Sequence, residues 1–120
     1  MKITQHAAGD VAVVAPAGRL IAEDNETLRN ALDTLVQQGR VKIVLDLREL
    51  TYVDSSGLGL MVSKCVSARR RGGDVKLLHP TARSQHLLDI THLSQVFDVF
   101  DSEADAIRAF GSSSFHAHPA

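Results

Sequence analysis

The sequence predicts an α/β domain built from alternating strands and helices. Short runs rich in β-branched residues alternate along the chain with segments whose apolar residues recur at helical spacing. The run Val41–Leu47 has a continuous apolar centre, which is typical of a strand covered on both faces. Together these observations predict a layered domain with at least one parallel strand pairing.

Length and composition indicate one folded domain and exclude several classes of protein. The chain has 120 residues, of which 44% are hydrophobic and 22% are charged, an ordinary globular composition. Its 13 basic and 14 acidic side chains give a net charge of −1, so no overall positive charge points to nucleic acid as a direct partner. No apolar run approaches the roughly 20 residues of a membrane helix, and the start lacks the pattern of a secretion signal. The single Cys65 excludes an intrachain disulfide, so we expect a reduced, cytoplasmic setting without membrane partners.

The amino-terminal segment is predicted to form a strand pair. Val11–Ala15 is a β-branched run closed by Pro16 and Gly18, which is typical of a buried strand. A weaker strand over Lys2–His6 is expected to pair with it through a turn at Gly9-Asp10.

A helix is predicted over Asp24–Gln38, before the strand at Val41–Leu47. Gly39 suits the position that follows the end of a helix. The apolar residues at helical spacing are Leu28, Ala31, Leu32, Leu35 and Val36.

The central helix is predicted to begin after Asp54 and to end near Gly72-Gly73. Its apolar side includes Cys65, which we expect in the core because a buried free thiol behaves as a small hydrophobe. Arg69–Arg71 lie in the last turn, where positive charge complements the helix dipole. The remaining predicted elements are a strand over Val75–Leu78, a short helix over Thr81–Ile90, a strand over Val96–Phe100, and a helix from Ser102, its N-cap, to Phe110, with a frayed tail over residues 111–120.

The most informative segment, Asp54-Ser55-Ser56-Gly57-Leu58-Gly59, opens this central helix. The unsatisfied N–H groups and the dipole at a helix N-terminus favour a side-chain oxygen and, equally, a phosphate. One hypothesis is that Asp54 or Ser55 caps the helix, while Gly57 and Gly59 let it pack close to the sheet. The other is that Ser55 accepts a phosphate, which adds a charge of about −1.5 to −2 at a partner-facing surface.

The same segment resembles the STAS domains, and among them the bacterial anti-anti-sigma factors, or anti-sigma factor antagonists. The resemblance covers residues 2–110 and rests on Asp54–Gly59, the strand at Leu45–Leu47, Gly72-Gly73 before a strand, and Leu87–Leu93. It implies a single domain over residues 1–110 with a mixed sheet of about four to five strands and about four helices, packed mainly on one face.

The resemblance implies a regulator that is not itself an enzyme. Such a protein binds an anti-sigma factor with serine-kinase activity and so frees a sigma factor for transcription. Phosphorylation of Ser55 would block that binding, and a PP2C-type phosphatase would restore it. The implied contact surface is Asp54, Ser55, Ser56, Gly57, Leu58 and Gly59. We expect the chain to act as a monomer, with no cofactor and no metal.

The turn after the second strand departs from the family's pattern. Where the family commonly has Gly-Glu-Leu-Asp, this chain has Gly18-Arg19-Leu20-Ile21, so an acidic contact is absent from that place. Glu23 and Asp24 follow closely and are candidates to substitute for it in binding the partner. His92 stands where the family often has glycine, and histidine is among the residues that tolerate a positive φ.

Other functions are weighed on the same residues. STAS domains also serve as unphosphorylated structural or adaptor subunits of signalling scaffolds and of lipid or anion transport complexes, and Ser55 would then be only a helix cap. A hydrolase nucleophile elbow needs Gly-x-Ser-x-Gly, but Val53 stands at the first glycine position. A phosphate-binding loop needs a lysine after its last glycine, but Leu60 follows Gly59. The six histidines show no spacing typical of a zinc site.

Overall fold

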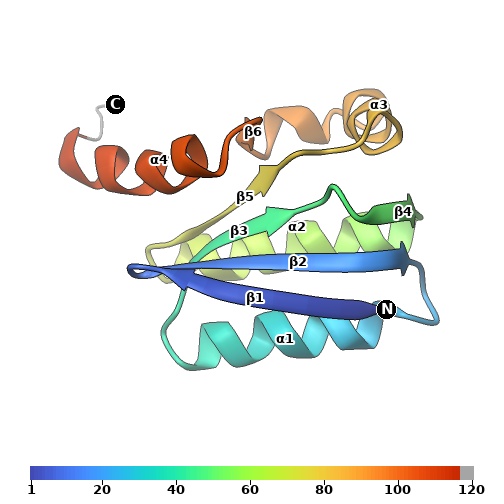
Figure 1. The fold of residues 1–120 in the computed structure, drawn as a ribbon, viewed down its shortest axis with the longest axis horizontal. Helices are drawn as coiled ribbons and strands as arrows, with labels where there is room; N and C mark the ends of the chain where they lie inside the picture. Colours follow the sequence, from blue (N-terminus) through green and yellow to red (C-terminus); the bar gives the residue numbers. More distant parts are fainter. Residues whose placement is uncertain (117–120) are drawn as a thin grey trace.

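A mixed β-sheet forms the centre of the computed structural model, which describes residues 1–116 and the side chains of residues 1–111 (Figure 1). The strands are β1 Lys2–Ala8, β2 Val11–Leu20, β3 Lys42–Asp46, β4 Leu50–Val53, β5 Asp74–Leu78 and β6 Val99–Phe100. The helices are α1 Asn25–Gln37, α2 Ser55–Arg70, α3 Ala82–Ile90 and α4 Glu103–His116, with a short 3₁₀-helix η1 at Leu93–Gln95. The strand order is β1-β2-β3-β5-β6, with β4 paired to β2. Only β1 and β2 are antiparallel among these pairings, so the predicted α/β fold with a mixed sheet is confirmed in the described residues.

Strand β2 is longer than predicted because it pairs with two different parallel strands. Its residues Val11–Val14 pair with β3, and its residues Gly18–Leu20 pair with β4. A strand end at Ala15, predicted from Pro16, is therefore wrong. Pro16 falls between the two parallel pairings, where β2 has no parallel neighbour that needs its missing N–H.

Strand β4 is absent from the sequence prediction. It has only four residues, with Leu50 and Val53 buried and the two between them exposed, so it lacks the alternation that marks a strand. Its pairing with the end of β2 defines it, and that pairing places the start of α2 beside the β2–α1 loop.

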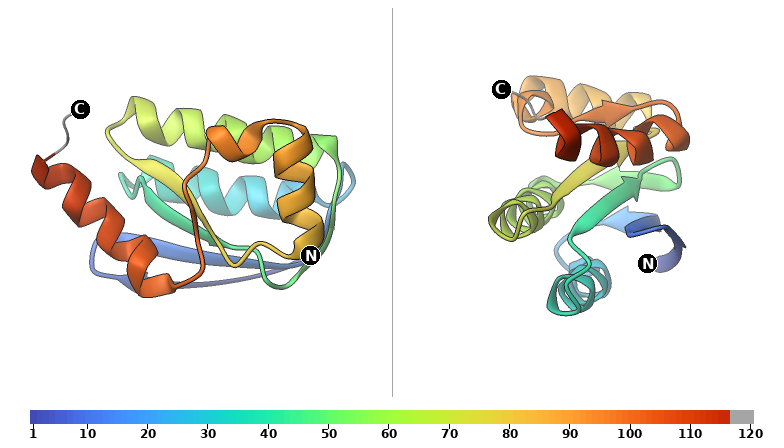
Figure 2. Two further views of the ribbon diagram at one scale, coloured as in Figure 1. Left: turned by 90° about the horizontal axis from the view of Figure 1, so that it is seen from above. Right: turned by 90° about the vertical axis from the view of Figure 1, so that its left-hand side faces the viewer.

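The helices lie on both faces of the sheet, with most of them on one (Figure 2). Leu32 of α1, Met61 of α2 and Leu88 of α3 share the larger core cluster. Ala106 and Phe110 of α4 belong to a second, smaller cluster. The predicted packing of helices mainly on one face is thus confirmed, and α4 is the helix on the other face.

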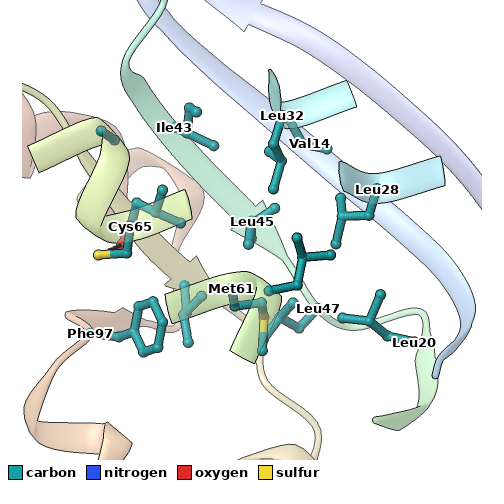
Figure 3. Packing of buried hydrophobic residues seen from close by; sticks show 14 of the residues in the cluster. Val14, Leu20, Leu28, Leu32, Ile43, Leu45, Leu47, Met61, Cys65 and Phe97 are labelled. Atoms are coloured by element: carbon teal, nitrogen blue, oxygen red, sulfur yellow. Dashed lines mark hydrogen bonds between the residues drawn. The ribbon is translucent and has the colours of Figure 1, made fainter. Parts of the chain in front are cut away.

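Both faces of the central strands are buried. Along β2, Ala12 and Val14 lie in the larger cluster, whereas Val11 and Val13 lie in the smaller one. This alternation explains why the run is apolar at every position. Figure 3 shows the larger cluster, and Cys65 lies in it with no exposed surface, as predicted. Burial raises the pKa of the Cys65 thiol, so it is an inert core group.

The carboxyl-terminal third differs most from the prediction. The strand predicted over Val96–Phe100 is reduced to β6, because η1 and the turn after it are helical and the Phe97 amide donates to the Leu93 carbonyl. His92 before η1 has a φ of 63°, a left-handed conformation in which histidine is enriched among residues other than glycine. Helix α4 continues to His116, so its predicted end at Phe110 is wrong, and residues 111–116 of the predicted frayed tail are helical. Residues 117–120 of that tail lie outside the described residues.

A buried lysine connects β5 to α4. The side chain of Lys76 is only 6% exposed, and its Nζ lies 3.2 Å from Asp74 Oδ2 and 2.9 Å from Asp98 Oδ2. The same Nζ lies 4.8 Å from the centre of the Phe110 ring, in cation–π contact. This cluster holds α4 against the sheet with a charge that is paired on two sides.

Candidate functional site

Two loops meet at the carboxyl ends of β2 and β4. The Asp54 amide donates to the Leu20 carbonyl at 3.1 Å, and the Ala22 amide donates to Asp54 Oδ2 at 3.3 Å. These bonds join the β2–α1 loop to the start of α2. We call residues 21–25 and 54–59 together the Ser55 site.

Asp54 is the N-cap of α2. Its backbone is extended, with a φ of −104°, and its Oδ1 accepts from the Gly57 amide at 2.9 Å and from Ser56 Oγ at 2.7 Å. These donors, the Ser56 hydroxyl foremost, lower the pKa of Asp54, so the carboxylate is ionised at neutral pH. The capping hypothesis is therefore correct for Asp54 and leaves Ser55 free of that role.

The two serines of the site differ sharply. Ser55 is the first residue of α2 and is exposed, and its hydroxyl has no hydrogen-bond partner among the described residues. Ser56 is also exposed, but its Oγ is held between Asp54 and the side chain of Asn25, whose Nδ2 donates to it at 3.2 Å. Ser55 is therefore the serine whose hydroxyl can react without breaking a bond within the chain.

Asn25 belongs to the site although the sequence analysis does not identify it. It is the first residue of α1, it is 5% exposed, and its Oδ1 has no hydrogen-bond partner among the described residues. A buried polar atom without a partner costs about 1–3 kcal/mol. No signal in the sequence identifies Asn25, because an asparagine at a helix start is commonplace.

The two glycines of the site have different surroundings. A Cβ on Gly57 would lie 2.6 Å from the Leu20 carbonyl oxygen and 2.8 Å from Leu20 Cγ, so only glycine lets α2 approach β2 this closely. A Cβ on Gly59 would meet nothing within 4 Å, and Gly59 is exposed. The close-packing explanation thus holds for Gly57 and is wrong for Gly59.

The remaining predicted site residues fall into buried and exposed groups. Leu58 is buried in the larger core cluster, so its side chain faces away from the surface. Glu23 is exposed and Asp24 is half-buried in the β2–α1 loop, and Asp24 makes no side-chain cap to α1. The fold thus brings this acidic loop, far away in sequence, to the start of α2.

The chemistry available at the Ser55 site is that of one free hydroxyl beside an ionised carboxylate. Within the described part of the chain, no group of three His, Cys, Asp or Glu side chains could hold a metal ion, and no helix is long and apolar enough to cross a membrane. Two surface pockets, one beside Lys76 and one beside His6, contain none of the site's residues. A phosphate on Ser55 would lie at a helix N-terminus, where the dipole favours negative charge.

Comparison with known proteins gives concordant results. The family model described as "STAS domain" matches residues 2–106. An anti-sigma F factor antagonist from Paenibacillus polymyxa is 28% identical over 98 residues, which cover 81% of this chain and 84% of that protein. An anti-sigma-B factor antagonist from Bacillus subtilis (strain 168) is 32% identical over 83 residues, which cover 69% of this chain and 75% of the relative.

The fold has solved counterparts. The unphosphorylated form of the anti-sigma factor antagonist SpoIIAA superposes with a TM-score of 0.79 at 23% identity, covering 92% of this chain and 97% of that one. The phosphorylated form of the Bacillus SpoIIAA superposes with a TM-score of 0.72 at 22% identity, covering 90% and 98%. At these identities the likeness concerns the fold alone.

Proposed function

Because the chain belongs to the STAS domain family, we propose that it is an anti-sigma factor antagonist. In this role it binds an anti-sigma factor and thereby releases a sigma factor for transcription. The names of its relatives in Paenibacillus polymyxa and Bacillus subtilis support the role. The chain acts as a binding protein, and the anti-sigma factor is the partner that carries the serine-kinase activity.

The exposed, unpartnered hydroxyl of Ser55 carries the regulatory part of the proposal. The kinase transfers the terminal phosphoryl group of a nucleoside triphosphate to Ser55 Oγ. The new O–P bond forms as the bond to the departing nucleoside diphosphate breaks, and the hydroxyl proton passes to a base of the kinase. The phosphate is stabilised at the N-terminus of α2, but it repels and sterically blocks a surface fitted to a small hydroxyl.

The proposed contact surface combines the start of α2 with the acidic loop before α1. Its residues are Asp54, Ser55, Ser56, Gly57, Leu58, Gly59, Glu23 and Asp24. Ser55, Gly59 and Glu23 are exposed and would touch the partner. Gly57 and Leu58 are buried and contribute by fixing the position of α2. A glycine at the exposed position 59, where this chain has room for a Cβ, is consistent with close approach by a partner.

A PP2C-type phosphatase removes the phosphate by hydrolysis and restores binding. The STAS domain, residues 1–110, works as a cytoplasmic monomer.

The test combines phosphate mapping with binding by the same preparation. The protein is recovered from its own host in growing and stressed cells, phosphate is located by peptide mass spectrometry, and co-purifying chains are identified. A kinase-like partner that binds the wild type and Ser55→Ala but not Ser55→Asp is expected. Ser55 that is unmodified in every condition, with a transporter or scaffold protein co-purifying, would refute the phosphoswitch and favour the adaptor role.

The matched control is Ser63→Asp. Ser63 is an exposed serine of the same helix, about two turns after Ser55, so this variant makes the same change away from the helix start. Binding that is lost with Ser55→Asp and kept with Ser63→Asp assigns the effect to the start of α2.

A further inference from the structure

Asn25 distinguishes between the two adjacent serines of the Ser55 site. Both serines are exposed, so exposure alone does not decide which one a kinase modifies. Ser56 Oγ donates to Asp54 Oδ1 at 2.7 Å and accepts from Asn25 Nδ2 at 3.2 Å, whereas nothing among the described residues holds the Ser55 hydroxyl. We propose that Asn25 is a positioning residue that withholds Ser56 from phosphorylation and so directs the phosphate to Ser55.

This inference rests on the phosphorylation proposed above and follows from what that reaction needs. The serine oxygen must present a lone pair to the terminal phosphorus of a nucleoside triphosphate. Its proton must pass to a base of the kinase while the nucleoside diphosphate leaves. In Ser56 the proton is held by Asp54 and a lone pair by Asn25, so the hydroxyl is fixed in orientation. Ser55 has neither restraint.

The arrangement also makes a phosphate on Ser56 unfavourable. Asn25 is 5% exposed, and its Oδ1 already lacks a partner in the described part of the chain. Moving Ser56 Oγ away would leave Nδ2 buried without its partner as well. The phosphate would further stand against the Asp54 carboxylate, whose oxygen now lies 2.7 Å from Ser56 Oγ.

Asn25 can be separated experimentally from Asp54. Asp54 also caps α2 and binds the Ala22 amide, so its loss would disturb the whole site. The only side-chain hydrogen bond of Asn25 among the described residues is the one to Ser56. Replacing Asn25 therefore frees a lone pair of Ser56 Oγ, while the Ser56 hydroxyl still donates to Asp54 and the cap of α2 stays in place.

The experiment compares four main chains, with two further variants, in the protein's own host under the conditions in which the wild type carries phosphate. They are the wild type, Ser55→Ala, Asn25→Ala, and the double variant with both changes. Phosphate on Ser55 and on Ser56 is distinguished by peptide fragmentation. Thr27→Ala, at an exposed position of α1, is the control, and Asn25→Leu repeats the test with the buried volume filled. Circular dichroism confirms that each variant is folded.

The wild type should carry most of its phosphate on Ser55, and Ser55→Ala should carry only a small amount on Ser56. Losing one ordinary hydrogen bond should raise Ser56 phosphate roughly two- to tenfold, both in the double variant over Ser55→Ala and in Asn25→Ala over the wild type. A double variant with no more Ser56 phosphate than Ser55→Ala would overturn the inference and leave the proposed switch intact. A wild type without phosphate on either serine would overturn the proposed switch, and the inference with it.

Discussion

The contrast between Gly57 and Gly59 provides a sharp test of the packing of α2. Both glycines lie in the same helix, two residues apart, so replacing either one with alanine gains a similar helix propensity of up to about 1 kcal/mol. The new Cβ at Gly57 meets the Leu20 carbonyl oxygen at 2.6 Å, and backbone cannot move aside as a side chain can. Overpacking of this kind costs about 1–3 kcal/mol. Because the gain in helix propensity is common to both variants, the free energy of unfolding of Gly57→Ala should be about 1–3 kcal/mol lower than that of Gly59→Ala.

Urea unfolding followed by far-UV circular dichroism measures this difference. With a slope of about 1–3 kcal/mol per M, the unfolding midpoint of Gly57→Ala should lie roughly 1 M below that of Gly59→Ala. Gly59→Ala should be at least as stable as the wild type, because its Cβ meets nothing within 4 Å. A Gly57→Ala protein that unfolds at the same urea concentration as Gly59→Ala would show that α2 does not approach β2 as described.

Two further predictions concern charge. The Ser56 hydroxyl and the Gly57 amide lower the pKa of Asp54 on folding. The ionised carboxylate therefore stabilises the fold fully above the unfolded pKa of about 3.8. This stabilisation is lost as the pH falls through the lower, folded pKa. Asp54→Asn should therefore lower the urea midpoint more at pH 7 than at about pH 3, and an equal loss at both pH values would contradict this. Lys76→Ala should cost more than about 2 kcal/mol, because it removes a buried partner of Asp74 and the contact with Phe110. Asp98→Ala should lower the free energy of unfolding by less than about 1 kcal/mol, because the Asp98 side chain is 62% exposed. Equal losses for Lys76→Ala and Asp98→Ala in urea unfolding would contradict this prediction.

Much of the fold follows from local patterns in the sequence. The helices at α1, α2 and α3 and the strands at β3 and β5 appear close to their predicted bounds, because their apolar spacing and end signals are local. The elements that were predicted wrongly are those whose bounds depend on contacts with a distant part of the chain. Pro16 indicates a strand end, but β2 continues past it because its parallel partner changes from β3 to β4. Strand β4 has no strand-like pattern of its own and is defined by its pairing with β2. In Val96–Phe100, alternation is present but the first residues pack as a helical turn that buries Phe97.

The start of α2, with Asp54 and the two serines, is predictable from the sequence alone. The helix start has a local motif, formed by a capping aspartate, two serines and a nearby glycine. Such a motif can be recognised from the sequence because its residues are adjacent. The different roles of these residues follow from the packing of the folded chain. Gly57 is tight against Leu20 while Gly59 is open, and Ser56 is tied to Asn25 from another helix while Ser55 is free. The physical reason is that these contacts join residues far apart in the sequence, 31 positions for Asn25 and Ser56, and their distances depend on how α1, α2 and the sheet pack together.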